Sequence, residues 1–335
     1  MFNRTIALMI AAVAALAPIG AYAQDKINLR FTTAWDPNFI GTIVGYKKFV
    51  DSVAAASGGR ITFTVTGPEV VAGTQQFEPV SHGVFDAGFS SPAYYVGTTG
   101  VPYAFLALKP DAGMWRQKGY WDIVDKELQR FNQKLIAFFP ASPQEEAYQI
   151  LLREPLGDGD QPLKGRKIRG NRSYEPLVAA LGGQIVNLPM SEMYSGLEKG
   201  VVDGAAFTLV GIEDLKVQEV TKFMVRPQFG SVVYSIAMNL KKFNNLSAAD
   251  QQLLLDKGRE IEATAPVDYT TAATASMSKL KDAGMKETVL DPVLFKQVST
   301  ALRAGIWKDA IAGNQQASGR VAELYDIAKK NGDAQ

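Results

Sequence analysis

Two strand-and-helix units follow each other in residues 163–204, and this segment constrains the fold more than any other. The pattern predicts a short strand over 167–169, then a helix, and a second strand over 184–188. A further helix is expected over 191–200. Arg169 stands where the first strand ends and a loop begins, so its guanidinium can point into a cleft. That group is a planar, permanently charged fork that matches a carboxylate, although an arginine here can equally serve a surface ion pair.

The N-terminal part of the chain has the same kind of alternation. Strands are expected over 27–32, 60–66 and 86–89, with helices over 41–56 and 74–84 between them. A strand–helix–strand–helix–strand order argues for parallel pairing in a layered α/β lobe. The sequence therefore predicts one complete lobe before the segment that contains Arg169.

The rest of the chain indicates how a second lobe is connected. A helix over 115–131 and a strand over 134–139 precede it, and a strand over 231–239 is expected to return to the first lobe. Helical patterns cover 247–281 and most of 292–330. Because no flexible linker or internal repeat is present, segments must cross between the lobes, which favours a hinged cleft.

The first residues have the pattern of a secretory signal peptide. Arg4 precedes an apolar run over 6–16, and Ala21-Tyr22-Ala23 is a small-x-small cleavage site. The run is too short to favour a permanent membrane span. We therefore expect a mature protein that starts at Gln24 and diffuses freely in the periplasm.

Composition excludes several classes of function. The chain has no Cys and only one His, so disulfides, thiolate metal sites and His clusters are not expected. Without Arg4, its 35 basic residues become 34, equal to its 34 acidic residues. This balance gives no sign of nucleic-acid binding. His82 lies in a predicted amphipathic helix without a partner nucleophile, so a structural role is favoured over a catalytic one.

A set of short motifs recurs in order along residues 163–204. They are Leu163-Lys164-Gly165, Lys167-Ile168-Arg169, Leu181-Gly182, Pro189, Ser191-Glu192, Tyr194, Leu197, Gly200 and Val202-Asp203-Gly204. They resemble the periplasmic solute-binding proteins of TRAP transporters, the DctP-type family. Family-like blocks also lie upstream, in FVDSVAAASGGRITFTV, and downstream, in NLKKFNNLSAADQQLL, so the resemblance spans nearly the whole mature chain.

The resemblance implies an α/β, two-lobed periplasmic binding protein fold (type II-like) with a hinged cleft. A long helix spans both lobes in this family, and 249–281 is its candidate here. The expected division is a signal peptide over 1–23, lobe I over 24–146 and about 235–274, and lobe II over 147–234 and about 275–330.

The resemblance also implies a function, the capture of a small organic acid through a salt bridge between its carboxylate and Arg169. The protein would deliver this ligand to a two-part membrane permease driven by a sodium gradient. We expect a monomer without cofactor, metal or catalytic residue. A sensing subunit for a receptor kinase is an alternative with the same cleft, and a secreted enzyme acting on a small acid is a second one.

Other candidate ligand contacts come from loops and strand ends. Ser91 and Tyr94 follow a predicted parallel strand, where ligands of open α/β sheets bind, although turn chemistry explains them equally well. Trp35 follows the first strand and either faces the same crevice or packs over the edge of the lobe. Tyr148 lies near a family ligand position and is otherwise an ordinary core residue.

Three more candidates bear on the character of the cleft. Phe207 occupies a position where sialic-acid-binding relatives carry Asn, and Met190 matches an apolar wall position. Together with Trp35 they favour a monocarboxylate with an apolar or aromatic body. Arg172 is a possible second anchor or a solvated charge at a helix start.

Overall fold

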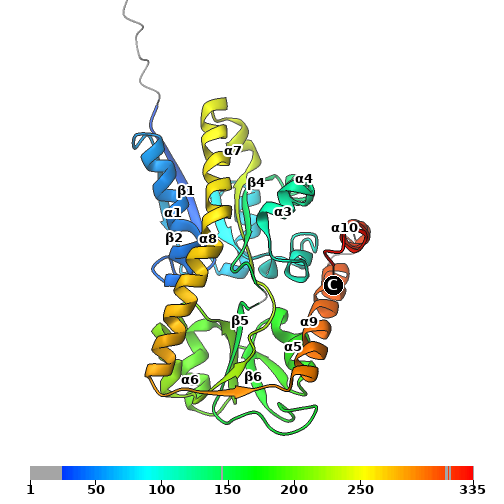
Figure 1. Cartoon of the computed structure of the whole chain (residues 1–335). Helices are drawn as coiled ribbons and strands as arrows, with labels where there is room; N and C mark the ends of the chain where they lie inside the picture. Colours follow the sequence, from blue (N-terminus) through cyan, green and yellow to red (C-terminus); the bar gives the residue numbers. More distant parts are fainter. Residues whose placement is uncertain (1–24, 145, 314–315, 317, 335) are drawn as a thin grey trace, which may run out of the picture.

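The computed structural model describes residues 25–144, 146–313, 316 and 318–334. The predicted signal peptide and its cleavage site lie outside these residues. Two β-sheets with their covering helices form two lobes, and one long helix, α8 (Ala248–Asp282), runs along both of them (Figure 1). This arrangement confirms the two-lobed α/β fold that the sequence predicted.

The sheet of lobe I has five strands in the order β2-β1-β3-β10-β4. Strand β1 pairs in parallel with β2 and β3, whereas β10 lies antiparallel between β3 and β4. The strand that was expected to return to this lobe is therefore β10. The strands are β1 (Ile27–Thr33), β2 (Ile61–Thr66), β3 (Ala87–Ser90), β4 (Gln133–Pro140) and β10 (Val233–Asn239).

Helices of 5 to 17 residues cover lobe I, and two of the predicted helices differ from them. The helices of this lobe are α1 (Ile40–Ala56), α2 (Phe77–Ser81), α3 (Ala112–Gln117), α4 (Tyr120–Gln129) and α7 (Leu240–Asn244). The helix expected over 74–84 is a 3-10 turn, Gly73–Gln75, followed by the short helix α2. The single helix predicted over 115–131 is two helices, because Gly119 adopts a left-handed φ of 74° that interrupts it. Asp111 caps the first of the two by accepting a hydrogen bond from Met114 N at 2.9 Å.

The sheet of lobe II has six strands in the order β11-β9-β5-β8-β6-β7. Strand β6 pairs in parallel with β7 and β8, and β5 is antiparallel to β8 and β9. The helices α5 (Glu175–Ala180) and α6 (Met193–Glu198) follow β6 and β7. The strands are β5 (Tyr148–Leu152), β6 (Lys167–Gly170), β7 (Gln184–Asn187), β8 (Gly204–Thr208), β9 (Phe223–Arg226) and β11 (Lys286–Val289).

Helix α8 joins the two lobes along its length. Ser247 caps it by accepting a hydrogen bond from Asp250 N at 3.1 Å. On lobe I it lies so close to β4 that a Cβ on Gly258 would be 2.0 Å from the carbonyl oxygen of Ile136. On lobe II, Ser276 accepts a hydrogen bond from Gly211 N at 3.0 Å. The long bridging helix that the resemblance implied is therefore present.

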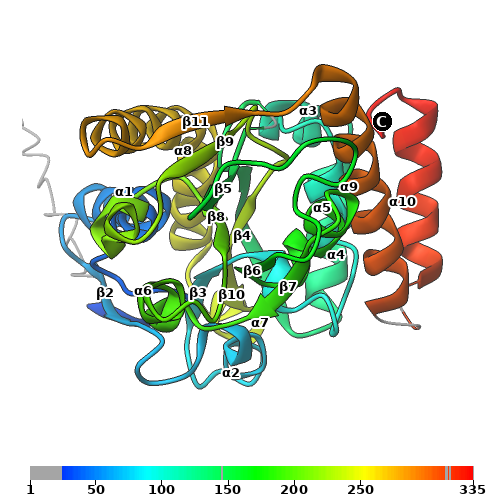
Figure 2. The ribbon, with the colours of Figure 1, turned by 90° about the horizontal axis from the view of Figure 1, so that it is seen from below.

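The last two helices lie side by side along one flank of the molecule (Figure 2). Helix α9 (Pro292–Gly313) packs against α5 of lobe II and against the turn Tyr103–Ala107 of lobe I. Helix α10 (Ser318–Lys330) contacts lobe I, where Arg320 forms an ion pair with Glu127 at 2.5 Å. The expected division placed all of 275–330 in lobe II, but α10 lies against lobe I.

Candidate ligand-binding cleft

Arg169 lies on β6, next to the edge strand β7 of the lobe II sheet, and its charge acts on Tyr94 of lobe I. Its side chain is buried, with 6% of the residue exposed. Nε donates a hydrogen bond to Leu188 O at 3.0 Å, and Nη1 donates to Ala206 O at 3.5 Å. The guanidinium carbon is 5.5 Å from the centre of the Phe207 ring. These contacts fix the guanidinium while leaving some of its five N–H donors available.

No carboxylate among the described residues neutralises Arg169. Burial lowers its pKa, and only the phenols of Tyr174 and Tyr94 oppose that shift. Taking a cation out of water without a counter-ion costs several kcal/mol, so buried charges are normally paired. A bound anion would therefore supply the negative charge that Arg169 lacks among the described residues.

Tyr94 of lobe I provides a neutral donor near this cation. Burial raises the pKa of Tyr94, although the hydrogen bond from Trp35 and the charge of Arg169 act in the opposite direction. Its hydroxyl oxygen accepts a hydrogen bond from Trp35 Nε1 at 2.7 Å. No described residue accepts the proton of this hydroxyl, which can therefore be donated to a bound anion.

A cavity of about 50 Å³, here called the inner chamber, lies between the lobes beside these two residues. Arg169 is not part of its wall, but Phe207, on which the guanidinium lies, and Tyr94 both are. The wall combines aromatic rings with hydroxyl and amide groups. Lobe I contributes Trp35, Phe39, Thr42, Ser91 and Tyr94, and lobe II contributes Tyr148, Asn171, Ser173, Phe207 and Thr208.

The two lobes touch each other at the edge of the inner chamber. Phe39 of lobe I and Phe207 of lobe II make an edge-to-face contact with ring centres 6.4 Å apart. Gly211 has a φ of 75°, and a Cβ on it would be 2.3 Å from Ile40 Cγ2. The structure therefore represents the closed arrangement of the cleft, with a close backbone approach that glycine permits.

The family model for bacterial extracellular solute-binding proteins, family 7 (DctP), matches residues 40–312. The chain belongs to this family. A relative is the monocarboxylate 2-oxoacid-binding periplasmic protein of Nostoc sp., which is 25% identical over 274 residues, 78% of this chain and 73% of the relative. The ectoine-binding periplasmic protein of Halomonas elongata is 27% identical over 168 residues, 45% of this chain and 48% of that one.

Solved structures show the same fold. A TRAP periplasmic solute-binding protein from Desulfovibrio salexigens with bound orotic acid superposes with a TM-score of 0.76 at 20% identity. The superposition covers 91% of this chain and 99% of the chain from Desulfovibrio salexigens. One from Rhodoferax ferrireducens with bound malonate gives 0.74 at 20% identity, covering 90% and 99%. The predicted family and fold are thus confirmed.

The structure brings most predicted contact residues of this family-7 protein together at the inner chamber. Tyr148 is buried in its wall, and burial raises the pKa of its phenol, which therefore stays protonated. Ser91 also lines it, while its Oγ accepts a hydrogen bond from Ala93 N at 3.4 Å. Ser91 thus has the turn role that the sequence offered as the alternative, at a position that also faces the chamber.

Two predicted residues lie away from the inner chamber. Arg172 has a side chain that is 53% exposed and pairs with Asp309 of α9 at 3.0 Å. That hydrogen bond raises the pKa of Arg172. Met190 packs against a hydrophobic cluster that includes Met193, Leu197 and Phe207. Arg172 is thus a half-exposed, ion-paired residue outside the chamber wall, and its role as a second anchor stays a prediction.

Thr42 and Asn171, which were not among the predicted site residues, each bring a hydrogen-bonding group to the chamber wall. Thr42, in the first turn of α1, is only 1% exposed, and its Oγ1 has no hydrogen-bond partner among the described residues. Asn171 Oδ1 accepts hydrogen bonds from Ser173 N at 3.0 Å and from Ser173 Oγ at 2.6 Å. The amide nitrogen of Asn171 makes no hydrogen bond within the described part of the chain. Both groups can therefore hydrogen-bond a ligand.

The described residues offer neither a metal cluster nor a membrane span. Within them, no group of three or more His, Cys, Asp or Glu side chains is arranged to hold a metal ion. None of their helices is long and apolar enough to cross a bilayer.

Proposed function

We propose that this solute-binding protein captures a small monocarboxylate in the cleft between its lobes. The observation that carries the proposal is the buried guanidinium of Arg169, which has no carboxylate partner among the described residues. A ligand carboxylate would supply the missing negative charge and accept hydrogen bonds in a bidentate geometry. The monocarboxylate 2-oxoacid-binding relative from Nostoc sp. and the orotic acid bound by the protein from Desulfovibrio salexigens support this class of ligand. Malonate, bound by the protein from Rhodoferax ferrireducens, is a dicarboxylate and supports only the capture of a carboxylate.

Groups from both lobes would hold the acid. Arg169 of lobe II and the neutral phenol of Tyr94 of lobe I would share its carboxylate, since the two act on each other across the gap. The rings of Trp35, Phe39 and Phe207 form an apolar part of the chamber wall. Because contacts to both lobes exist only when the cleft is closed, binding shifts the population toward the closed state.

The partner proposed for this protein is the membrane permease of a TRAP transporter. Membership of the family and the likeness to TRAP periplasmic solute-binding proteins support this assignment. The periplasmic location and the monomeric state remain predictions from the sequence. A closed, loaded protein would present its two lobes to the permease, and opening would release the acid.

The test replaces Arg169 by Lys after a thermal-shift screen of organic acids has identified the acid that binds best. Lysine keeps the charge but offers a point donor with a strongly hydrated ammonium group instead of a planar fork. We expect a loss of roughly 2–5 kcal/mol, or more than about thirtyfold in affinity. Titration calorimetry measures the affinity, and circular dichroism checks that the variant is folded.

Arg172→Lys is the matched control, because this neighbouring arginine is ion-paired with Asp309 and lies outside the chamber wall. Its affinity should stay within about twofold of that of the wild type, as expected for an exposed charge. A folded Arg169→Lys variant that binds within about threefold of the wild type would show that Arg169 is not the carboxylate anchor.

A further inference from the structure

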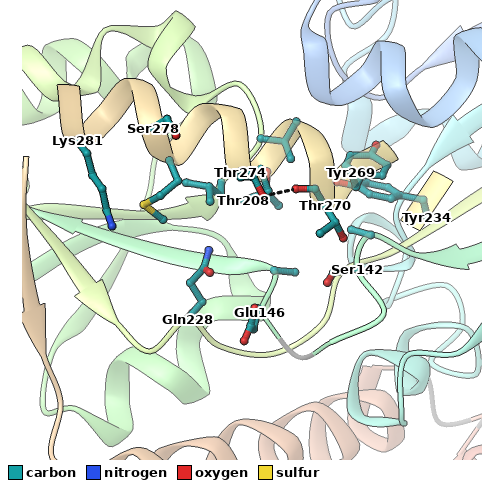
Figure 3. Close-up of a pocket in the computed structure, with 16 residues that line it drawn as sticks. Ser142, Glu146, Thr208, Gln228, Tyr234, Tyr269, Thr270, Thr274, Ser278 and Lys281 are labelled. Carbon is teal, nitrogen blue, oxygen red and sulfur yellow. Dashed lines mark hydrogen bonds between the residues drawn. The ribbon is translucent and has the colours of Figure 1, made fainter. Parts of the chain in front are cut away.

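A second and larger cavity adjoins the inner chamber. This outer chamber has a volume of about 370 Å³ and is lined by α8 and by residues of the connections between the lobes, Ala141, Ser142, Glu146, Ala147 and Gln228 (Figure 3). Its volume falls within the ~300–1,000 Å³ typical of small-molecule sites, whereas the 50 Å³ inner chamber is far smaller. The inner chamber therefore has room for an acid group and little else.

Two residues, Thr208 and Tyr234, line both chambers and form the partition between them. Tyr234 is held in place, since it stacks on Tyr269 with ring centres 5.1 Å apart and an interplanar angle of 15°. Thr208, at the end of β8, is only half-buried, and its hydroxyl makes no hydrogen bond within the described part of the chain. A small rotation of Thr208 is thus the least costly way to connect the chambers.

The wall of the outer chamber is suited to an uncharged ligand body. Thr270 Oγ1 donates to Pro266 O at 2.8 Å, and Thr274 Oγ1 donates to Thr270 O at 2.9 Å, so both hydroxyl protons are used within α8. Lys281 is already paired with Glu287 at 3.0 Å. Much of the remaining wall is apolar, with Ala141, Ala147, Leu209, Val210, Ala273 and Met277.

The exposed carboxylate of Glu146, at the rim of this chamber, disfavours a second negative charge in the ligand. We propose that the ligand is an elongated monocarboxylate. Its acid group occupies the inner chamber, and its chiefly apolar body passes Thr208 and Tyr234 into the outer chamber. This inference rests on the proposed function, because it takes Arg169 as the anchor of the carboxylate.

The test compares straight-chain acids from propanoate to octanoate as probes, by titration calorimetry on the mature protein. If the body enters the outer chamber, each added methylene should raise affinity about fourfold. Octanoate should then bind more than about a hundredfold more tightly than propanoate. In Thr274→Phe, which fills the outer chamber, this ratio should fall below about fivefold while propanoate affinity stays unchanged.

Two further variants on α8 make the test specific. Ser278→Phe fills the same chamber from another position and replaces Thr274→Phe if that variant does not fold. Thr271→Phe is the matched control, since Thr271 is exposed on the same helix and lies outside the chamber wall, and it should keep the wild-type ratio.

A flat dependence on chain length in the wild type, or a steep one that survives both filling variants, would overturn the inference. In either case propanoate binding that Arg169→Lys abolishes would leave the proposed function standing. If the wild type binds no acid of the series and none in a broad screen of organic acids, both proposals fail together.

Discussion

Thr42 shows how one buried hydroxyl can mark a ligand site. A threonine in a helix commonly donates its hydroxyl to a carbonyl of the preceding turn. The carbonyl oxygen of Phe39, three residues before Thr42, already accepts hydrogen bonds from Thr42 N and Ile43 N, both at 2.9 Å. Thr42 Oγ1 is buried without a hydrogen-bond partner among the described residues. An unsatisfied buried hydroxyl costs about 1–3 kcal/mol, which a ligand atom in the inner chamber would recover.

We therefore predict opposite effects of Thr42→Val on binding and on stability. The isosteric change removes a group that is unsatisfied in the free protein, so the free energy of unfolding should stay the same or rise slightly. Affinity for the acid should fall by about fivefold, corresponding to about 1 kcal/mol for one lost hydrogen bond. Chemical denaturation and calorimetry on the same sample measure the two quantities.

Thr33→Val is the matched control for this pair of effects. Thr33 is also fully buried, but its Oγ1 donates to Trp35 O at 2.6 Å. Its replacement should destabilise the protein by about 1–3 kcal/mol. A Thr42→Val variant that loses as much stability as Thr33→Val would mean that Thr42 has a structural role instead.

At the scale of elements, Gly258 allows α8 to pack closely on β4. Helix propensity alone favours Ala over Gly by about 1 kcal/mol in a helix interior. The close packing of α8 on β4 reverses this preference, because a Cβ on Gly258 would be 2.0 Å from the Ile136 carbonyl oxygen, which belongs to the backbone of β4 and cannot easily move.

Gly258→Ala should therefore destabilise the protein by about 1–3 kcal/mol despite the better helix former. Gly319→Ala in α10 is the control, since nothing lies within 4 Å of a Cβ at that position, and it should be neutral or stabilising by up to about 1 kcal/mol. Urea denaturation, monitored by circular dichroism, measures the free energy of unfolding of both variants. A stabilising Gly258→Ala would mean that α8 and β4 are farther apart than described.

At the scale of the whole molecule, closure and charge are coupled. The closed cleft holds Arg169 at 6% exposure without a counter-ion among the described residues, which is costly when no acid is bound. Opening of the lobes would let water reach the guanidinium. We therefore expect the acid-free protein to be open for most of the time and the loaded protein to be closed.

Small-angle X-ray scattering should accordingly show a smaller radius of gyration with saturating acid than without it. The reason is that the Phe39–Phe207 contact and the backbone approach at Gly211 exist only when the lobes meet. Arg169→Lys at the same acid concentration serves as the control and should remain expanded. An unchanged radius in a sample that binds acid by calorimetry would argue against hinge closure.

Local patterns were sufficient for the strands of lobe I, for β6 and β7 and for most helices, because those depend on alternation and helical periodicity along a short stretch of chain. The short strands β8, β9 and β11 of lobe II were not predicted. Local patterns were insufficient wherever the role of a residue or the position of a helix depends on a long-range contact. Arg169 and Arg172 are three residues apart, yet only Arg172 meets Asp309, which is 137 residues away along the chain. The amphipathic pattern of α10 predicts a buried face but does not indicate which lobe covers it. Thr42 has an ordinary helical position, and only the tertiary structure shows that its hydroxyl is unpaired.

The antiparallel insertion of β10 has a consequence for the order in which the protein can be built. β3 and β4 are joined only through β10, which lies more than ninety positions after β4 along the chain and after most of the second lobe. Until β10 arrives, β3 and β4 expose unpaired edges, and α10 adds its contacts with α4 later still. Lobe I, although it begins the chain, is therefore completed after the central strands of lobe II. No cut between 146 and 147 can release it as a finished domain, and the pairings that complete it are non-local, a feature that slows folding.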